Sequence, residues 1–453
     1  MFNNLFVNKI FSFTDNVAVI INDISFTYVH LNESVKKACK FLIEQKIIPG
    51  KSVVIKADYN FESISLFLAL IENRNIIIPI TTKNTVEFND RLNEANCDFI
   101  ITIVNGEFET EIINKDQANT SHYLISEIVE KDVSGLILFS SGSTGRPKAM
   151  IHNLDNITST FMDKRGKPLI FLVFLSFDHI GGLNTLFNCL AMGATIVIPN
   201  ERKPEIICNL IQKYKISILP SSPTFLNLLL ISKAHEHYDL SSLKMITYGT
   251  EPMPESLLLK LRTELPHVRF MQTFGTSETG IVKTQSKSSS SLFLKFEDPN
   301  QEHKIVDGEL WLRSKTQILG YLNHSNESFT KDGWFKTGDI VEVLEDGYLK
   351  IIGRSKEIIN IGGEKVLPME VENLILQIDG VNDCVVFGQQ NAIMGQIVTA
   401  NISINEKSDP VQIKKEVIKL CKEKLDNYKI PSKVNIVSMI DFNDRFKKDR
   451  KLQ

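Results

Sequence analysis

Cysteine is scarce and scattered in this chain. The 453 residues include six cysteines, and no two of them form a C-x-x-C pair. Close pairs of that kind are typical of zinc sites and redox-active disulfides, so the spacing favours neither. We therefore expect reduced thiols buried in the core, and we predict a cytoplasmic protein.

The chain also has no large excess of positive or negative charge, and it has no long uninterrupted apolar run. The formal net charge is −3 at pH 7, which gives no electrostatic reason to expect nucleic acid or an anionic membrane surface as a partner. An apolar stretch at residues 68–80 is interrupted by Glu72, Asn73 and Arg74, so we predict no membrane span. The N-terminus has no basic segment followed by an apolar one, so we expect no signal peptide.

Along the chain, the spacing of the apolar residues alternates between that of a helix and that of a strand. They make up 43% of the chain, enough for a large core and for two or three domains. Helical spacing at residues 28–43 and 61–72 is followed by strand-like runs at 52–55 and 75–79, and the alternation continues to the end of the chain. This pattern predicts an α/β fold: mixed, mostly parallel sheets with helices, then a small α+β domain at the C-terminus.

A loop rich in hydroxyl groups and glycine follows the predicted strand at residues 136–138. Residues 139–148 read Phe-Ser-Ser-Gly-Ser-Thr-Gly-Arg-Pro-Lys. Glycine lets the backbone approach a ligand closely, and exposed N–H groups in such a turn form an anion site. The G-x-x-x-x-G-K-[ST] spacing of a Walker A loop is absent. The composition therefore favours a phosphate-binding loop of another kind over an ordinary polar surface loop.

Polar residues also follow three later predicted strands, at 169–175, 244–248 and 268–272. The segments that follow read Ser-Phe-Asp-His-Ile-Gly-Gly-Leu at 176–183, Gly-Thr-Glu at 249–251 and Thr-Phe-Gly-Thr-Ser-Glu-Thr-Gly at 273–280. Open α/β sheets bind ligands at the carboxyl ends of their strands. We expect these segments to form one binding site.

Together these segments resemble the motifs of the adenylate-forming, or AMP-binding, enzymes in that family's order. The loop at 140–148 is similar to the signature loop, and 273–280 to the Tyr-Gly-x-Thr-Glu motif. Asp-Gly-Trp-Phe-Lys-Thr-Gly-Asp at 332–339 is a further match, and the resemblance to acyl-CoA and aryl-CoA ligases covers the chain. It implies an AMP-binding and acyl-substrate domain at residues 1–354 and a mobile C-terminal domain at 355–453.

The resemblance implies a set of nucleotide-binding residues. Glu278 corresponds to the Mg²⁺ ligand and Ser277 to a donor to the α-phosphate, while Phe274 replaces the usual tyrosine that stacks on adenine. Asp339 would accept both ribose hydroxyls, as one carboxylate can, and Arg354 would lie near the ribose and phosphate. The expected ATP- and AMP-binding residues are Ser140, Ser141, Gly142, Ser143, Thr144, Gly145, Lys148, Gly249, Thr250, Glu251, Thr273, Phe274, Gly275, Asp339 and Arg354.

The acyl pocket can be matched to the family in two registers. In the ligase register, His179 corresponds to the catalytic histidine beside the substrate carboxylate. In the other, Asp178 corresponds to the aspartate that holds the ammonium in amino-acid-activating domains. The Ile-Gly-Gly-Leu that follows favours the ligase register and a substrate without an α-amino group. The expected pocket residues are Asp178, His179, Gly182, Tyr248, Gly249 and Thr276.

The resemblance also assigns moving parts to the C-terminal domain. Lys356 occupies the hinge position, and the adjacent Gly362 and Gly363 match the loop that admits the thiol. Two adjacent glycines suit a backbone that must pass close to a pantetheine chain.

The catalytic lysine of the family normally lies in a Thr-x-x-Gly-Lys-x-x-Arg segment. Here Lys447 holds the place of the lysine, but Asn443 replaces the threonine and Phe446 replaces the glycine. Lys448 is a rival for the role. Because glycine adopts backbone conformations that phenylalanine rarely does, we expect the change at Phe446 to restrict the loop.

The implied reaction is the ATP- and Mg²⁺-dependent joining of a small carboxylic acid to a thiol through an acyl adenylate, with release of pyrophosphate. Coenzyme A is the expected acceptor, and the phosphopantetheine of a separate acyl carrier protein is the main alternative. Two further alternatives are an amino-acid-activating enzyme and a non-catalytic scaffold that keeps the fold.

Overall fold

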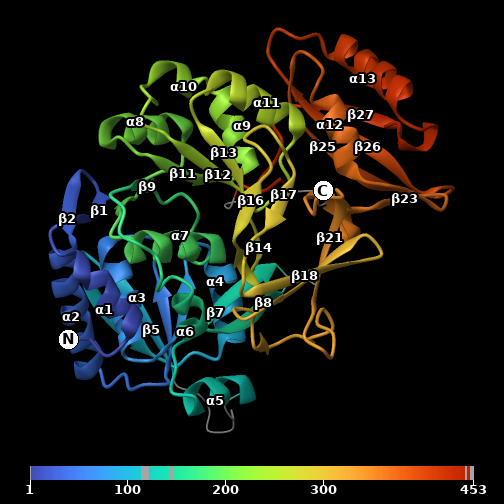
Figure 1. Ribbon diagram of the computed structural model, residues 1–453. Helices are drawn as coiled ribbons and strands as arrows, with labels where there is room; N and C mark the ends of the chain where they lie inside the picture. The colour runs from blue at the N-terminus through green and yellow to red at the C-terminus, as the bar shows by residue number, and fades with distance from the viewer. Residues whose placement is uncertain (1, 114–121, 142–145, 444–445, 449–453) are drawn as a thin grey trace.

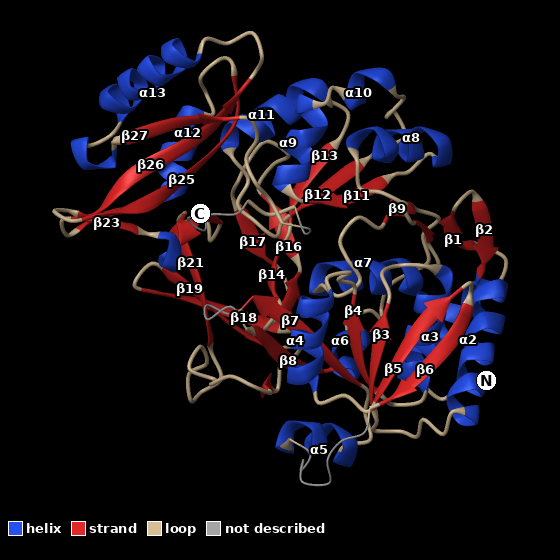
Figure 2. Cartoon of the chain, turned by 180° about the vertical axis from the view of Figure 1, so that it is seen from behind, coloured by secondary structure: helices blue, strands red, loops and turns tan. Residues whose placement is uncertain are grey.

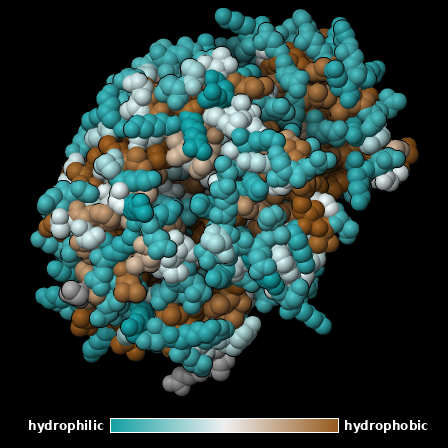
Figure 3. All heavy atoms as spheres, viewed as in Figure 1, coloured by the Kyte–Doolittle hydropathy of each residue, from teal (hydrophilic) through white to brown (hydrophobic). Residues whose placement is uncertain are grey.

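The computed structural model describes residues 2–113, 122–141, 146–443 and 446–448. Over these ranges the chain forms two seven-stranded sheets, a six-stranded sheet, a two-stranded ribbon and a C-terminal five-stranded sheet. In Figure 1 the C-terminal sheet and its helices, orange to red, project from one corner of the larger body. Hydrophilic residues cover most of the face seen in Figure 3.

The first sheet consists of parallel strands except at one edge, where β1 and β2 form a hairpin. Its order is β13 (Arg269–Gln272), β12 (Met245–Tyr248), β11 (Ile218–Ser221), β9 (Ile170–Leu172), β10 (Thr195–Val197), β1 (Val17–Ile21) and β2 (Ile24–Thr27). In the register of β11, β12 and β13, Ser221, Tyr248 and Gln272 lie side by side. The carboxyl ends of these strands therefore meet at one edge.

The second sheet is parallel in its centre and antiparallel at both edges. Its order is β20 (Gly320–Tyr321), β8 (Pro147–Asn153), β7 (Gly135–Ser141), β4 (Ile76–Ile80), β3 (Ser52–Lys56), β5 (Phe99–Val104) and β6 (Glu107–Ile112). The predicted phosphate loop connects β7 to β8. Its residues Gly142, Ser143, Thr144 and Gly145 lie outside the described ranges.

Helices fill the space between the two seven-stranded sheets and cover their outer faces. The shared middle layer holds α1 (Leu5–Ile10), α2 (Tyr28–Glu44), α3 (Phe61–Glu72), α6 (Leu154–Ser159) and α7 (Ile180–Ala191). The outer face of the first sheet is covered by α8 (Pro204–Tyr214), α9 (Pro223–Ile231), α10 (Ala234–His237) and α11 (Glu255–Glu264), and that of the second by α4 (Thr85–Ala95) and α5 (Tyr123–Glu130).

The period of two in the strands explains this layering. On β3, Val53 and Ile55 belong to the shared middle core, whereas Val54 belongs to the outer core with α4 and α5. Successive side chains of a strand point to opposite faces, so continuous apolar runs such as β4 are buried on both sides. Local caps start the middle helices, with Thr27 capping α2 and Asn60 capping α3.

The third sheet is antiparallel and lies beside the other two. Its order is β16 (Thr284–Ser286), β17 (Leu294–Phe296), β22 (Leu349–Arg354), β21 (Phe335–Val343), β19 (Glu309–Ser314) and β18 (Gln301–Val306). The ribbon of β14 (Phe274–Thr276) and β15 (Gly280–Val282) links it to the end of β13.

The C-terminal sheet has its own apolar core. It contains β24 (Glu364–Val366), β23 (Ile359–Ile361), β26 (Gly395–Ile404), β25 (Val381–Asn391) and β27 (Lys433–Val437), with α12 (Pro368–Ile375) and α13 (Pro410–Lys424) beside it (Figure 2). The short helix η2 (Ser355–Glu357) separates it from β22. The domain boundary at residue 354 and the hinge at Lys356 stay predictions.

The predicted fold class is confirmed, and so are most of its elements. The expected helices at 28–43 and 61–72 are found within one residue, and the strands expected at 244–248 and 268–272 are β12 and β13. The strand expected at 169–175 is shorter than predicted, because β9 ends at Leu172. The polar segment after β5 turns back as the exposed strand β6 and pairs with β5 along its length. No helix in the described part of the chain is long and apolar enough to cross a membrane.

Phe67 lies in the middle layer, and its substitution would measure how much the packing of this layer contributes to stability. Its side chain is fully buried on α3, and its ring centroid lies 5.3 Å from that of Phe177 and 5.9 Å from that of Phe187. We expect Phe67→Ala to lower the free energy of unfolding by about 3–5 kcal/mol, because it leaves a cavity that the rigid layers cannot close.

Urea denaturation followed by circular dichroism would measure this change. Ile43→Ala is the control, because Ile43 on α2 is 75% exposed and its truncation should cost less than about 0.5 kcal/mol. Equal effects of the two substitutions would contradict the assigned layering.

His152 on β8 gives the fold a dependence on pH. The ring is fully buried, with its Nδ1 3.4 Å from the carbonyl oxygen of Thr316, and burial lowers the pKa of His152 from 6.5 to about 4. Between these values the unfolded chain binds a proton that the folded chain does not, so stability falls as pH falls. We expect a loss of about 3 kcal/mol on going from pH 7 to pH 4 through His152 alone.

Urea denaturation of the wild type and of His152→Gln at the two pH values would isolate this contribution. The variant should lose less stability by that amount, because glutamine does not titrate. An identical loss in both proteins would show that His152 is not responsible.

Candidate active site

A cavity of about 540 Å³ opens at the carboxyl ends of β11, β12 and β13. The residues at or just after these ends line it, namely Pro220, Ser221, Thr247, Gly249, Thr250 and Thr273. Side chains of α7 and of the segment before it complete this side of the cavity. The edge predicted to bind a ligand is therefore hollow.

The remaining walls come from parts of the chain that are distant in sequence. Ser140 and Lys148 reach the cavity from the β7–β8 hairpin, and residues 335–338 reach it from β21 of the third sheet. Lys356 and Lys447 contribute from the C-terminal region. The cavity thus lies where both large sheets, the third sheet and the C-terminal region meet.

The turn after β12 is held in an unusual conformation. A Cβ atom on Gly249 would lie 2.6 Å from Oγ1 of Thr273, so only glycine fits this close contact between neighbouring strand ends. The next residue, Thr250, has a φ of +71°, which is strained for a β-branched side chain. Its buried Oγ1 has no hydrogen-bond partner among the described residues. The turn therefore holds a buried hydroxyl, without a described partner, on a residue that lines the cavity.

The β14–β15 ribbon presents Ser277 and Glu278 at its tip. Oγ1 of Thr276 accepts a hydrogen bond of 3.0 Å from the backbone N–H of Thr279, which closes the turn. The backbone N–H of Ile318 donates to the carbonyl of Glu278 over 2.8 Å and ties the tip to the chain before β20. Both tip residues line the cavity.

Tyr321 supports Glu278 and was not singled out from the sequence. Its hydroxyl donates a hydrogen bond of 3.1 Å to Oε1 of Glu278, and burial together with that carboxylate raises its pKa far above the ordinary value. Nζ of Lys148 lies 5.6 Å from the centre of the Tyr321 ring. Burial and the nearby Lys356 lower the pKa of Lys148, and the carboxylates of Glu278 and Glu327 oppose that shift.

Asp339 and Arg354 are paired across β21 and β22. Nε of Arg354 donates to Oδ1 of Asp339 over 3.0 Å, whereas the buried Oδ2 has no hydrogen-bond partner among the described residues. Burial raises the pKa of Asp339, and the guanidinium of Arg354 opposes that rise. A buried carboxylate oxygen without a donor is costly, so this atom is suited to accept a hydrogen bond from a ligand hydroxyl.

Cationic groups outnumber anionic ones around the cavity. Among the described lining residues, five side chains carry positive charge and three carry negative charge: Lys148, Lys336, Arg354, Lys356 and Lys447 against Glu278, Glu309 and Glu327. In a hollow with low-dielectric walls such an excess attracts anions. The arrangement suits a polyphosphate held beside one carboxylate.

The two candidates in the 176–183 segment occupy different environments. His179 caps α7 through its Nδ1, which accepts from the N–H of Gly181, and it lines the cavity. Asp178 is 3% exposed and does not line the cavity; it accepts hydrogen bonds from Arg91 over 2.6 Å and from the Ser176 hydroxyl over 2.9 Å. The charge of Asp178 is thus paired within the protein. The geometry therefore favours the ligase register, in which His179 and not Asp178 lies beside the substrate.

The two candidate lysines also occupy different environments. Lys447 lines the cavity, whereas the ammonium of Lys448 turns away and donates to Asp383 and to the carbonyl of Cys384, the latter over 3.0 Å. Burial lowers the pKa of Lys448, but the charges of Asp383 and Glu372 raise it by more, so that the pKa is raised overall. Of the two, Lys447 is the one that lines the cavity.

The structure thus gathers most of the described site residues around one cavity. Those that line it are Ser140, Lys148, His179, Gly249, Thr250, Thr273, Phe274, Gly275, Thr276, Ser277, Glu278, Arg354, Lys356 and Lys447. Asp178, Gly182, Tyr248, Glu251, Asp339, Gly362 and Gly363 do not line it. Of these, Gly182 is packed so closely that a Cβ would lie 2.1 Å from the carbonyl oxygen of Ser176, and Tyr248 is buried under the strand ends.

No group of three or more His, Cys, Asp or Glu side chains that could hold a metal ion occurs in the residues that the structure describes. Magnesium bound together with nucleotide phosphates commonly uses only one or two carboxylates. Glu278 on its ribbon tip fits that role, with the phosphates as the expected remaining ligands.

Comparisons with known proteins agree with this architecture. The sequence model of the AMP-binding enzyme family matches residues 8–322, and that of the AMP-binding enzyme C-terminal domain matches residues 370–447. The Caenorhabditis elegans acyl-CoA synthetase 7 is 31% identical over 334 residues, which cover 67% of this chain and 61% of that protein. The 2-succinylbenzoate–CoA ligase of Bacillus licheniformis is 25% identical, over 95% of this chain and 94% of its own.

Among solved structures, the anthranilate CoA ligase AuaEII in complex with anthranoyl-AMP superimposes with a TM-score of 0.82 at 19% identity. The match covers 99% of this chain and 96% of that one. At this identity the likeness shows the fold alone. The family models and the relatives carry the assignment further, and they confirm the resemblance predicted from the motifs: the chain belongs to the family of AMP-binding enzymes.

Proposed function

We propose that this enzyme is an ATP-dependent ligase that adenylates a carboxylic acid and transfers the acyl group to coenzyme A. One observation carries the proposal: Glu278 on the ribbon tip and Lys447 from the C-terminal loop line the same cavity. That cavity also has an excess of cationic groups. The relatives named above as coenzyme A ligases support coenzyme A as the acceptor, and a cytoplasmic location stays an expectation.

Nucleotide binding follows from the unused polar atoms of the site. Oδ2 of Asp339 lacks a partner among the described residues, and it would accept from a ribose hydroxyl, with Arg354 holding the carboxylate in place. Phe274 on β14 offers a flat face for the adenine, and its ring is itself packed 5.6 Å from that of Phe296. Ser140, Ser277 and Lys148 would bind the phosphates.

Glu278 would hold Mg²⁺, oriented by its hydrogen bond from Tyr321. The bound ion supplies positive charge that offsets the charge of the phosphate oxygens. Lys148 and Lys447 add protein charges on the same anion. A carboxylate that is oriented before the ligand arrives loses little freedom on binding.

In the first half-reaction, an oxygen of the substrate carboxylate attacks the α-phosphorus of ATP, and pyrophosphate leaves with the electrons of the broken P–O bond. The protein contributes position and charge rather than a covalent intermediate. Lys447 would stabilise the charge on the transferring phosphoryl group. His179 would orient the carboxylate from the N-terminal end of α7.

In the second half-reaction, the thiol sulfur of coenzyme A attacks the acyl carbon and its proton passes to water. The bond between the acyl carbon and the phosphate oxygen breaks, and AMP leaves with the bonding electrons. The two glycines matched to thiol entry, Gly362 and Gly363, lie on the β23–β24 turn and away from the cavity in this structure. We infer that rotation about Lys356 brings them in and withdraws Lys447, a hinge-type change of the C-terminal region.

The acid is expected to lack an α-amino group. The described cavity side chains on and before α7 are Leu175, His179, Ile180, Asn184 and Thr185, and none of these carries a negative charge to hold an ammonium. Asp178, the residue that would do so in an amino-acid-activating enzyme, is already paired with Arg91. An aryl or aliphatic acid fits this wall better.

The test is ATP–pyrophosphate exchange with a panel of aryl, short-chain, medium-chain and amino acids, with coenzyme A withheld. We expect exchange with one class of acid without an α-amino group, and none when Mg²⁺ is removed by a chelator. Adding coenzyme A should then release AMP and form the thioester, detected by mass spectrometry. Exchange with no acid in the panel would overturn the proposal.

Lys447→Ala separates the two half-reactions. Without the ammonium, the charge that develops during adenylation loses one of its stabilising groups, so we expect exchange to fall by about 100-fold or more. Thiolysis of a supplied acyl adenylate should change by less than about twofold, because the first half-reaction is already complete.

Lys419→Ala is the matched control, because Lys419 is an exposed lysine on α13 of the same C-terminal region. It should leave both half-reactions unchanged. If Lys447→Ala also left both unchanged, the assignment of Lys447 would be wrong.

A further inference from the structure

Lys447 is flanked by two residues that are each anchored to a different part of the molecule. On one side, the half-buried ring of Phe446 packs against the core of the large N-terminal body. Its centroid lies 5.1 Å from that of Phe174 and 5.5 Å from that of Phe225 at the start of α9, and it stacks on Phe442 at 5.4 Å. The aromatic side chain thus ties the loop to the layer that carries the cavity.

The backbone of Phe446 reveals the cost of this anchor. Its φ is +52°, in the left-handed region that favours glycine and is unfavourable for a residue with a Cβ atom. The turn is closed by hydrogen bonds from the N–H of Phe446 to the carbonyl of Asn443 over 2.8 Å and from the N–H of Lys447 to the Asn443 side chain over 3.2 Å. Phenylalanine therefore keeps the backbone shape expected of the family's glycine, and burial of its ring offsets the strain.

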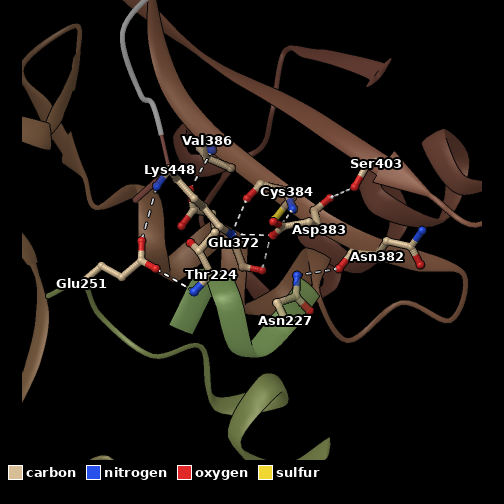
Figure 4. A network of polar contacts seen from close by, with 10 residues as sticks. All are labelled: Thr224, Asn227, Glu251, Glu372, Asn382, Asp383, Cys384, Val386, Ser403 and Lys448. Atoms are coloured by element: carbon tan, nitrogen blue, oxygen red, sulfur yellow. Dashed lines mark hydrogen bonds and ion pairs between the residues drawn. The ribbon is translucent and has the colours of Figure 1, made fainter. Parts of the chain in front are cut away.

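On the other side, Lys448 is anchored in the C-terminal region, as Figure 4 shows. Its side chain is 11% exposed, and the ammonium donates to the carboxylate of Asp383 and to the backbone of Cys384 at the start of β25. Glu372 of α12 adds a second buried negative charge and accepts from the N–H of Val386 over 2.8 Å. A buried ammonium that is paired in this way holds its position strongly.

Glu251 joins the two anchored sides. Its Oε1 accepts from the N–H of Thr224 on α9 over 2.7 Å, and its Oε2 lies 3.4 Å from the backbone nitrogen of Lys448, which donates to it. Nearby, the side-chain amide of Asn227 donates to the carbonyl of Asn382 over 3.1 Å. The lysine loop is therefore held from the N-terminal body and from the C-terminal region at once (Figure 4).

We propose that Phe446 and Lys448 are positioning residues that clamp Lys447 at the cavity while the acyl adenylate forms. The inference rests on the proposed adenylation role of Lys447. The two side chains hold the same short loop from opposite sides, so Lys447 has little freedom between them. A rotation of the C-terminal region carries Lys448 with Asp383 and must pull the Phe446 ring out of its aromatic cluster. The clamp therefore favours the first half-reaction and opposes the change that precedes the second.

Two substitutions loosen the clamp from its two sides. Phe446→Gly removes the aromatic anchor and relieves the backbone strain, while Lys448→Met keeps the length of the side chain and removes the ion pair. We expect each to lower ATP–pyrophosphate exchange about 10-fold or more, with thiolysis of a supplied acyl adenylate unchanged or faster. A loss of folding alone would lower both half-reactions together.

The controls use the full-length enzyme with the acid that the wild type accepts. Lys448→Arg keeps the charge and should restore exchange to within about threefold of wild type, and Lys419→Met on the exposed face of α13 should leave both half-reactions unchanged. Hydrogen–deuterium exchange adds a readout that needs no acid: the N–H groups of Phe446 and Lys447 should exchange faster in Lys448→Met than in wild type.

The outcomes separate the two proposals. No exchange by the wild type overturns the proposed function, and this inference with it. Exchange by the wild type that both Phe446→Gly and Lys448→Met retain overturns the clamp alone. Parallel loss of both half-reactions without a change in their ratio also overturns it, because that result indicates a merely structural role.

Discussion

The burial of one helical layer between two sheets constrains the rest of this structure. Residues of α2, α3 and α7 share a single apolar core with strands of both seven-stranded sheets, so neither sheet can shift without opening that core. The carboxyl ends of β11, β12 and β13 are thereby held against the β7–β8 hairpin, and the cavity lies between them. Phe187 anchors α7 in the same layer, which fixes the helix end that carries His179.

Around this frame, buried charges are matched individually. Asp178 is paired with Arg91, Asp339 with Arg354, and Lys448 with Asp383. Because an unpaired buried charge is costly, the unsatisfied atoms that remain carry information. Oδ2 of Asp339 and Oγ1 of Thr250 are two such atoms. Asp339 is paired with Arg354, which lines the cavity, and Thr250 lines the cavity itself. In the proposed function, Oδ2 of Asp339 is the atom that would accept a hydrogen bond from the ribose.

Much of the fold followed from local patterns. The helix expected at 61–72 and the polar segments after β9, β12 and β13 were found as predicted, because periodicity and strand ends are properties of neighbouring residues. The candidate site was harder to predict. Asp178 and His179 are adjacent in sequence, yet Asp178 is paired with Arg91 on α4, whereas His179 lines the cavity. Tyr321 had no local signal for its contact with Glu278, since its strand contributes only two residues.

The sequence by itself determined the family, the α/β class and the segments from which the site is built, because turn chemistry and the apolar period act over a few residues. Only the tertiary structure decided which members of those segments face the cavity and which of Lys447 and Lys448 reaches it. A pattern of buried positions specifies a face but not the partner packed against it. The role proposed for Phe446 depends on its contacts with Phe174 and Phe225, residues that only long-range packing brings near it.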